Sequence, residues 1–172
     1  MSVGETRQLA LLLVAAVGAL GTGCGTGVDC GPTSGVVAHV IDGDTIELES
    51  GEKIRYLLVD TPEITGGKNE CYGAGARDFN RNLVLGEGKK VNLTYGEACE
   101  DRYGRLLAYV SVDGVDVNAE LIKRGMGCVM FIPPAGESRQ DEFLEYQQDA
   151  RTRGRGLWAN CPASERPAVC PG

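Results

Sequence analysis

Three short charged segments contain the residues whose types and spacing could do chemistry. They are 42–45 (DGDT), 55–63 (RYLLVDTPE) and 101–105 (DRYGR), and each places charge at the end of a β-rich run. Each also has an ordinary explanation, because Asp-Gly pairs are common hairpin turns and most Asp and Arg pairs at turns lie in solvent. Their combination is more specific, and it predicts one shared site.

The residue types in these segments fit hydrolysis of a phosphodiester. Asp44 and Asp60 could share a hard cation, with a backbone carbonyl and waters completing its ligands. Glu63 is a third carboxylate that could hold or deprotonate a water. Arg55 and Arg105 are the residue type that binds phosphate oxygens in bidentate fashion and neutralises charge developing at phosphorus. A metal, a water, a carboxylate base and two guanidinium groups are together the requirements of metal-assisted phosphodiester hydrolysis.

Composition restricts the other function classes. The chain has 172 residues, with 24 Asp and Glu against 17 Lys and Arg, and a net charge of -7. Such a balance argues against a protein that holds duplex DNA on a broad basic face, since that binding needs many neutralised phosphates. The single histidine, His39, excludes sites that need several histidines. Any contact with nucleic acid must therefore be local.

The elements that would position these residues alternate between short strands and helices. Asp-Gly and Ser-Gly pairs separate β-rich runs, expected at 36–41, 45–50, 53–59, 90–95 and 105–112. Helical spacing predicts three helices, with Asn118 and Ser138 as N-caps and Gly125 ending the second; the expected ranges are 74–85, 118–124 and 138–153. The pattern predicts a β-barrel with helices (α+β), namely a five-stranded OB-type Greek-key barrel with about three helices.

The first residues resemble an export signal. Arg7 precedes the apolar run Leu9–Leu20, which is too short to span a bilayer, and small residues precede Cys24. We favour a lipoprotein-type signal peptide over residues 1–23 with Cys24 lipidated, although Gly21 stands where such signals usually have Leu. A plain secretory signal cut after Gly21 or Gly23 and a short hydrophobic anchor are the alternatives. The expected location is the cell envelope, at the outer membrane or cell surface, rather than free secretion.

The cysteines support export. Lipidation of Cys24 would leave six of the seven cysteines, an even set that indicates three disulfides in an exported protein. We expect residues 24–34 to be a flexible tether, residues 35–160 to form the domain, and residues 161–172 to form a tail tied by disulfides.

Five motifs in order resemble the staphylococcal nuclease (thermonuclease) family over roughly residues 36–158. They are VIDGDTIEL at 40–48, IRYLLVDTPE at 54–63, YGAGA at 72–76, DRYGRLLAYV at 101–110 and VNAELIKRG at 117–125. The resemblance implies a Ca²⁺-dependent nuclease with the OB-type fold that cuts DNA or RNA. It also implies 5′-hydroxyl and 3′-phosphate ends and a preference for single-stranded or frayed regions. The sequence leaves the oligomeric state open, and a monomer is the default expectation.

The resemblance also assigns roles to individual residues. It implies Ca²⁺ ligation by Asp44, Asp60 and the backbone carbonyl of Thr61, activation of water by Glu63, and phosphate clamping by Arg55 and Arg105. Arg102 and Tyr103 match positions that bind substrate, Tyr103 at the terminal phosphate. Where the family prototype has two tyrosines, this chain has Phe131 and Pro133, so a base could stack on Phe131 but both hydroxyls are lost.

The family fold suggests a disulfide pairing among the fifteen possible connectivities. The expected pairs are Cys71–Cys99, Cys128–Cys161 and Cys30–Cys170. Two other functions stay open: a non-catalytic nucleic-acid-binding or protein-binding OB module at the cell envelope, and an acidic envelope protein with a structural or docking role. The first is disfavoured because all five acidic and arginine positions remain, and the second predicts that replacing them leaves function intact.

Overall fold

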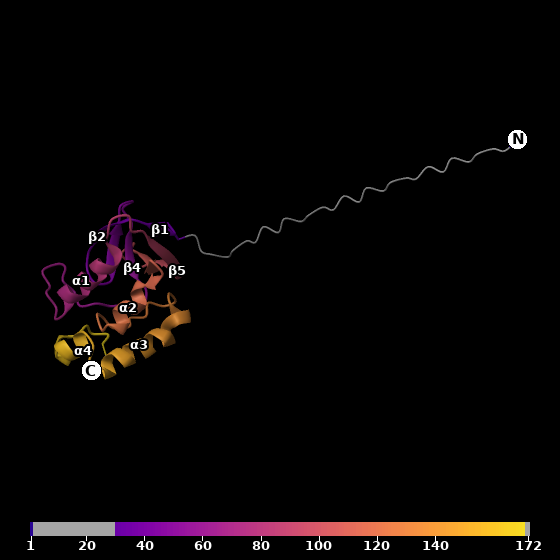
Figure 1. Cartoon of the computed structure of the whole chain (residues 1–172). Coiled ribbons are helices and arrows are strands. Elements are labelled where there is room, and N and C mark those ends of the chain that lie inside the picture. The colour runs from indigo at the N-terminus through magenta and orange to yellow at the C-terminus, as the bar shows by residue number, and fades with distance from the viewer. Residues whose placement is uncertain (2–29, 171–172) are drawn as a thin grey trace.

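A computed structural model describes Met1 and residues 30–170 of the chain, which fold into a sheet and several helices (Figure 1). The expected signal peptide, Cys24 and most of the expected tether lie outside the described residues. In the part that is described, no helix has the length and apolar character needed to cross a membrane.

Seven strands form one mixed sheet, which confirms an α+β fold. The strands are β1 (Ser34–Gly35), β2 (Val37–Val40), β3 (Thr45–Leu48), β4 (Lys53–Tyr56), β5 (Val91–Glu100), β6 (Leu106–Val112) and β7 (Val115–Asp116). Their order is β1-β5-β6-β4-β3-β2, with β7 paired to β6. Only the β4–β6 pair is parallel among these ladders. The five longer strands correspond to the five expected ranges, although β5 continues past its expected end to Glu100, and β1 and β7 have two residues each.

The two end strands of this order are neighbours in the chain. Only Val36 separates β1 from β2, and its carbonyl accepts a hydrogen bond of 2.9 Å from the Glu49 amide. β1 pairs with β5, whereas β2 pairs with β3. A single extended segment therefore contacts both ends of the sheet, although no ladder joins β1 to β2 in the described chain.

The three expected helices are confirmed, and one short helix is added. They are α1 (Gly73–Val84), α2 (Val117–Lys123), α3 (Gln140–Thr152) and α4 (Leu157–Asn160), with 3-10 turns η1 (Glu137–Arg139) and η2 (Ala163–Glu165). Figure 1 shows α3 and α4 at the end of the molecule away from the strands. Gly125, with φ of 68°, follows the end of α2 as expected, because glycine adopts this left-handed conformation without strain.

The expected N-caps are wrong for the second and third helices. Asp116 caps α2 by accepting a hydrogen bond of 2.9 Å from the Ala119 amide. Asn118 is fully buried and bonds the sheet instead, accepting from the Val110 amide at 2.8 Å and donating to the Leu57 carbonyl at 2.9 Å. Ser138 lies within η1, and no side chain caps α3. The sequence could not distinguish a capping Asn from one that satisfies distant backbone groups.

Apolar side chains form two clusters. The larger fills the space between the sheet and helices α1 to α3, and it includes Tyr56, Leu107 and Phe143. The second cluster is smaller, and it consists of Cys128, Ala150, Leu157, Trp158 and Cys161, with Cys71, Tyr72 and Cys170 packed against it. The second cluster joins the segment after α2 to the C-terminal residues.

Three disulfides form, as the even set of cysteines predicts, but all three expected pairs are wrong. The bonds are Cys30–Cys99, Cys71–Cys161 and Cys128–Cys170. Cys71, just before α1, and Cys128, after α2, each pair with a cysteine of the C-terminal segment, because all four cysteines meet in the second cluster. Chain order alone gave no sign of this convergence.

Residues 30–34, at the end of the expected tether, contact the sheet. The Pro32 carbonyl accepts a hydrogen bond of 2.7 Å from the Tyr95 hydroxyl, and the Thr33 carbonyl accepts one of 2.8 Å from the Leu93 amide. Together with the Cys30–Cys99 bond, these contacts attach this segment to β5.

Candidate active site

Arg55 lies at the centre of the acidic residues. It is on β4, paired with Thr45 of β3 and with Leu107 of β6, and it is only 3% exposed. Its Nε lies 3.2 Å from Asp44 Oδ1 and one terminal nitrogen lies 3.0 Å from Asp60 Oδ1. The other terminal nitrogen donates to the backbone carbonyls of Tyr56, at 3.0 Å, and Val59. The guanidinium group therefore fixes two carboxylates from different segments relative to the end of β4.

Asp44 is buried, and both of its carboxylate oxygens are engaged. Oδ2 accepts hydrogen bonds from the Thr61 amide at 2.7 Å and the Thr61 hydroxyl at 3.0 Å. Oδ1 accepts one of 3.0 Å from the Thr45 hydroxyl. These bonds join the turn before β3 to the loop after β4, so two motifs that are separate in sequence form one site.

Asp60 is the more accessible of the two aspartates, with a side chain 26% exposed. Burial raises its pKa to about 6, and although Arg55 opposes this, the negative charges of Asp44, Glu63 and Glu70 add to it. Its other carboxylate oxygen, Oδ2, accepts no hydrogen bond from the described residues. The site thus carries excess negative charge, which a cation would offset.

Glu63 begins the loop that follows Asp60, and Glu70 holds it in place. The Glu63 amide donates to Glu70 Oε2 at 2.8 Å, and the Glu70 amide donates to the Glu63 carbonyl at 2.9 Å. The Thr65 hydroxyl donates to Glu63 Oε2 at 2.7 Å. The Glu63 carboxylate is half-buried and its remaining oxygen can bond a water.

The 101–105 turn presents the second arginine. Arg105 bonds Asp101 Oδ2 through Nε at 2.7 Å and a terminal nitrogen at 2.6 Å. Partial burial alone would raise the pKa of Asp101, but hydrogen bonds from Arg105 and from the Tyr103 amide lower it below its usual value. Arg105 comes two residues before Leu107, the partner of Arg55 in the parallel β4–β6 ladder. This pairing brings the turn to the strand that carries Arg55.

The expected substrate-binding residues differ in exposure. Tyr103 is 68% exposed, and the guanidinium carbons of Arg102 and Arg105 lie 4.8 and 5.5 Å from its ring centre. This group is open to a ligand. Phe131, in contrast, is half-buried and packs against the main hydrophobic cluster. Its ring therefore contributes to the core.

Several supporting residues were not identified from the sequence as part of the site. The Asp44 amide donates to Asp42 Oδ1 at 3.0 Å, and the Asp42 carbonyl accepts from the Asn80 side chain at 3.2 Å. Burial, followed by the charge of Asp44, raises the pKa of Asp42 to about 7. The Asp-Gly-Asp spacing is a signal for the Asp42 turn, but nothing in the sequence pointed to Asn80, on α1, or to Glu70.

The donor chemistry of the site fits calcium. Within the described chain, no set of three or more His, Cys, Asp or Glu side chains is arranged to hold a metal ion. Asp44, Asp60 and the Thr61 carbonyl supply oxygen alone, and that carbonyl accepts no hydrogen bond from the described residues. Calcium takes carboxylate, carbonyl and water oxygens in flexible geometry. Two carboxylates and one carbonyl would leave positions for water and a phosphate oxygen.

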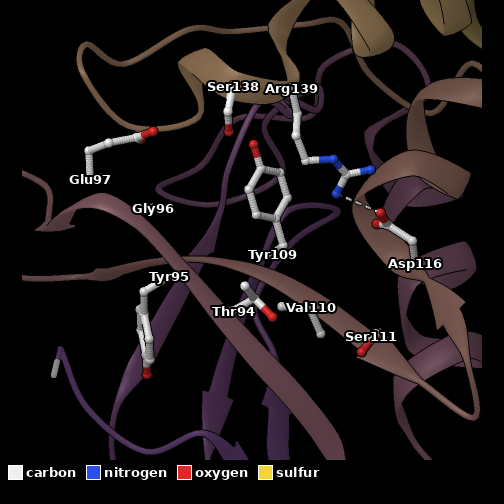
Figure 2. A pocket seen from close by; sticks show the side chains of 10 residues that line it. All are labelled: Thr94, Tyr95, Gly96, Glu97, Tyr109, Val110, Ser111, Asp116, Ser138 and Arg139. Carbon is white, nitrogen blue, oxygen red and sulfur yellow. Dashed lines mark ion pairs between the residues drawn. The ribbon is translucent and has the colours of Figure 1, made fainter. Parts of the chain in front are cut away.

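A pocket of about 510 Å³ lies elsewhere, between β5, β6 and η1 (Figure 2). Arg139 covers the ring of Tyr109, with its guanidinium carbon 4.6 Å from the ring centre, and pairs with Asp116 at 2.8 Å. None of the expected site residues lines this pocket. Asp44, Arg55 and Asp60 lie on β4 and the loops beside it, and Arg105 lies on the turn before β6, so this pocket does not mark the site.

Known proteins are similar to this chain in sequence. A family described as "Staphylococcal nuclease homologue" matches residues 53–160. The SPbeta prophage-derived endonuclease YokF of Bacillus subtilis (strain 168) is 36% identical over 127 residues, which cover 70% of this chain and 42% of that protein. Endonuclease YncB of the same organism is 39% identical over 127 residues, covering 70% and 59%. The thermonuclease of Staphylococcus hyicus is 34% identical over 129 residues, covering 72% and 75%. The chain spans about half the length of the two Bacillus proteins.

Proposed function

The chain belongs to the staphylococcal nuclease family, and on that premise we propose that it is a Ca²⁺-dependent nuclease that hydrolyses phosphodiester bonds in DNA, RNA or both. The observation that carries the proposal is the bridge from Arg55 to Asp44 and Asp60. It holds two oxygen ligands and a phosphate-binding group together at the end of one strand. Endonuclease and thermonuclease names among its relatives support the same reaction class.

Calcium, held by Asp44, Asp60 and the Thr61 carbonyl, would supply positive charge that polarises the phosphate. Glu63 orients the attacking water and takes its proton, because its carboxylate is anchored by Thr65 and its backbone by Glu70. Arg55 and Arg105 neutralise the charge that grows on the phosphate oxygens. Water attacks phosphorus in line with the 5′ oxygen, so the new P–O bond forms as the bond from phosphorus to the 5′ oxygen breaks. The proton lost by the attacking water goes to Glu63, and a solvent water protonates the leaving 5′ oxygen. The products are a 5′-hydroxyl and a 3′-phosphate.

Arg102 and Tyr103 are proposed to contact the substrate at its phosphate end. Their exposure and their stacking beside Arg105 support this role. Phe131 could stack on a base only if its ring leaves the core contacts described above. Unpaired strands are the proposed substrate because they can bring one phosphate close to the arginines without a broad basic face.

The test is cleavage of single-stranded DNA and RNA by the oxidised full-length chain, with Ca²⁺ or with EGTA. The parent is compared with Glu63→Gln and Arg55→Ala, and Glu87→Gln, an exposed change of equal charge, is the control. Calcium-dependent cutting that leaves 3′-phosphates should fall by about 10²–10⁴ in Glu63→Gln and also fall strongly in Arg55→Ala. A folded parent no more active than these two variants would exclude catalysis and favour the non-catalytic binding module.

The OB-type barrel is also a proposal. The continuous β1–β2 segment supports it, since that segment pairs with β5 at one end and with β3 at the other. The domain is proposed to cover residues 35–160, and a monomer is its proposed state. Sedimentation velocity at several concentrations tests the monomer.

We propose that the protein is exported, with residues 1–23 as its signal and a lipid on Cys24. Three disulfides support export, because such bonds persist in oxidising compartments. Metabolic labelling with a fatty acid should mark the parent and leave Cys24→Ser unlabelled. Label on neither protein would favour ordinary secretory cleavage.

A further inference from the structure

The second hydrophobic cluster adjoins both loops that carry acidic residues of the site. It contains the Cys71–Cys161 and Cys128–Cys170 disulfides. Cys161 and Cys170 lie beyond residues 53–160, which match the family. In this chain, therefore, a segment outside the family match is covalently joined to residues beside the site.

The first connection leads to Asp60. The Asp60 and Cys128 backbones form a reciprocal pair, with each amide donating to the other's carbonyl at 2.8 Å. Gly127 lies so close that a Cβ there would be 2.5 Å from the Asp60 carbonyl oxygen. Cys128 is fully buried and bonded to Cys170. A shift of Cys128 would therefore move the backbone of Asp60.

The second connection leads to Glu63. Glu63 and Glu70 are joined by the two hydrogen bonds described above, and Cys71 follows Glu70 directly. Cys71 is bonded to Cys161 in the same cluster. Both acidic segments are thus attached to one short stretch, residues 161–170.

We propose that residues 161–170 are a positioning element, which sets the place of Asp60 and Glu63 through Cys128 and Cys71 and thereby tunes calcium affinity. This inference rests on the proposed function. Its physical reason is that Asp44, Asp60, Glu63 and Glu70 repel one another, so their loops separate unless something holds them. Two disulfides fixed in a packed cluster resist that separation, and the cation then binds a prearranged set of oxygens.

The decisive variant is Cys170→Ser, which breaks one bond and leaves the buried Cys128 in place. Every protein is the oxidised full-length chain with Cys24→Ser, so that the Cys24 thiol cannot exchange with the disulfides. Calcium binding is measured by calorimetry without nucleic acid, and kcat is measured at saturating calcium. We expect the calcium Kd to rise about tenfold or more, as for other changes to groups that orient metal ligands. The kcat at saturating calcium should recover, because Glu63 and both arginines remain.

The matched control is Cys30→Ser. The Cys30–Cys99 bond has a sequence separation of 69 against 42 for Cys128–Cys170, so losing either should destabilise the fold comparably. Cys30 is bonded to Cys99 on β5 and contacts neither Asp60 nor Glu63 in the described chain, so its replacement should leave the calcium Kd unchanged. If Cys170→Ser and Cys30→Ser weaken calcium binding equally, the proposal is overturned, because a general loss of stability would then explain the effect.

A second variant, Gly127→Ala, keeps all three disulfides and presses directly on the Asp60 carbonyl. If circular dichroism shows that Cys170→Ser is unfolded, Gly127→Ala tests the proposal in its place. We again expect weaker calcium binding. An unchanged Kd in the folded variants overturns this inference alone. A parent that neither binds calcium nor cleaves nucleic acid overturns the proposed function instead.

Discussion

At Arg55, one guanidinium group bonds two carboxylates and two backbone carbonyls while almost fully buried. A lysine has one compact ammonium group and cannot reproduce this fork. We expect Arg55→Lys to lower kcat/KM by at least about a hundredfold, as loss of a preorganised charge at the phosphate does. Steady-state cleavage of a single-stranded oligonucleotide measures the effect. The control is Lys53→Arg, on the exposed start of the same strand, which should retain the parental kcat/KM. A lower kcat/KM in this control would show that any change on β4 impairs cleavage.

Two buried tyrosines differ in whether their hydroxyl has a partner. The Tyr109 hydroxyl bonds nothing in the described chain, whereas the Tyr56 hydroxyl donates to Asn80 Oδ1 at 2.9 Å. Burial of an unsatisfied polar group costs free energy, so Tyr109→Phe should stabilise the protein by about 1 kcal/mol. Tyr56→Phe should destabilise it by about 1–3 kcal/mol, because it leaves the buried Oδ1 atom of Asn80 without its hydrogen-bond donor. Urea unfolding of both variants checks the pair, and a loss of stability in Tyr109→Phe would contradict this explanation.

Arg139, just before the first residue of helix α3, links this helix to Asp116 of β7. Arg139 pairs with Asp116 and with Glu142, and the Tyr146 hydroxyl also donates to Glu142. The hydrogen bond from Arg139 contributes most to lowering the pKa of Glu142, which falls to about 2. A carboxylate with a lowered pKa stabilises the fold above its unfolded value, near 4.5, and this contribution disappears as the pH falls toward 2.

Glu142→Gln should therefore remove stability at neutral pH and leave it unchanged near pH 2. Because the side chain of Glu142 is 40% exposed, we expect a loss below about 1 kcal/mol. Urea midpoints of parent and variant from pH 7 to pH 2 should converge as the pH falls. Glu145→Gln, on the exposed side of the same helix, should track the parent throughout. A constant difference across this range would show that Glu142 acts through packing rather than charge.

For the whole molecule, a net charge of -7 means that a polyanion is attracted only near the arginines. If Arg55, Arg102 and Arg105 supply the phosphate contacts, the log of single-strand affinity should fall against log salt with a slope of about -2. Binding of a single-stranded oligonucleotide to the inactive Glu63→Gln variant, measured from about 50 to 200 mM salt, gives this slope. Arg102→Gln should reduce it by about 0.7. A slope of about -4 or steeper would indicate a wider basic surface.

The sequence alone predicted most of the elements and the candidate site. Alternating and helical patterns gave the five longer strands and three helices, since those patterns record which faces are buried. The charged segments at strand ends gave Asp44, Arg55 and Asp60, which the structure brings together. Asn118 is an exception, because its residue type and position predict a helix cap. Its side chain instead bonds the Val110 amide and the Leu57 carbonyl, which are distant in the chain and cannot be inferred from the local pattern.

What the sequence determined by itself was the local chemistry: residue types, periodicities, and an even set of cysteines apart from Cys24. Only the tertiary structure decided which cysteines pair and which groups support the site. Cys71, Cys128, Cys161 and Cys170 meet because α4 and the segment after α2 pack into one cluster. Pairing depends on distance in space, and that distance follows from how whole elements pack. A local pattern carries no record of it, and so all three expected disulfides were wrong while their number was right.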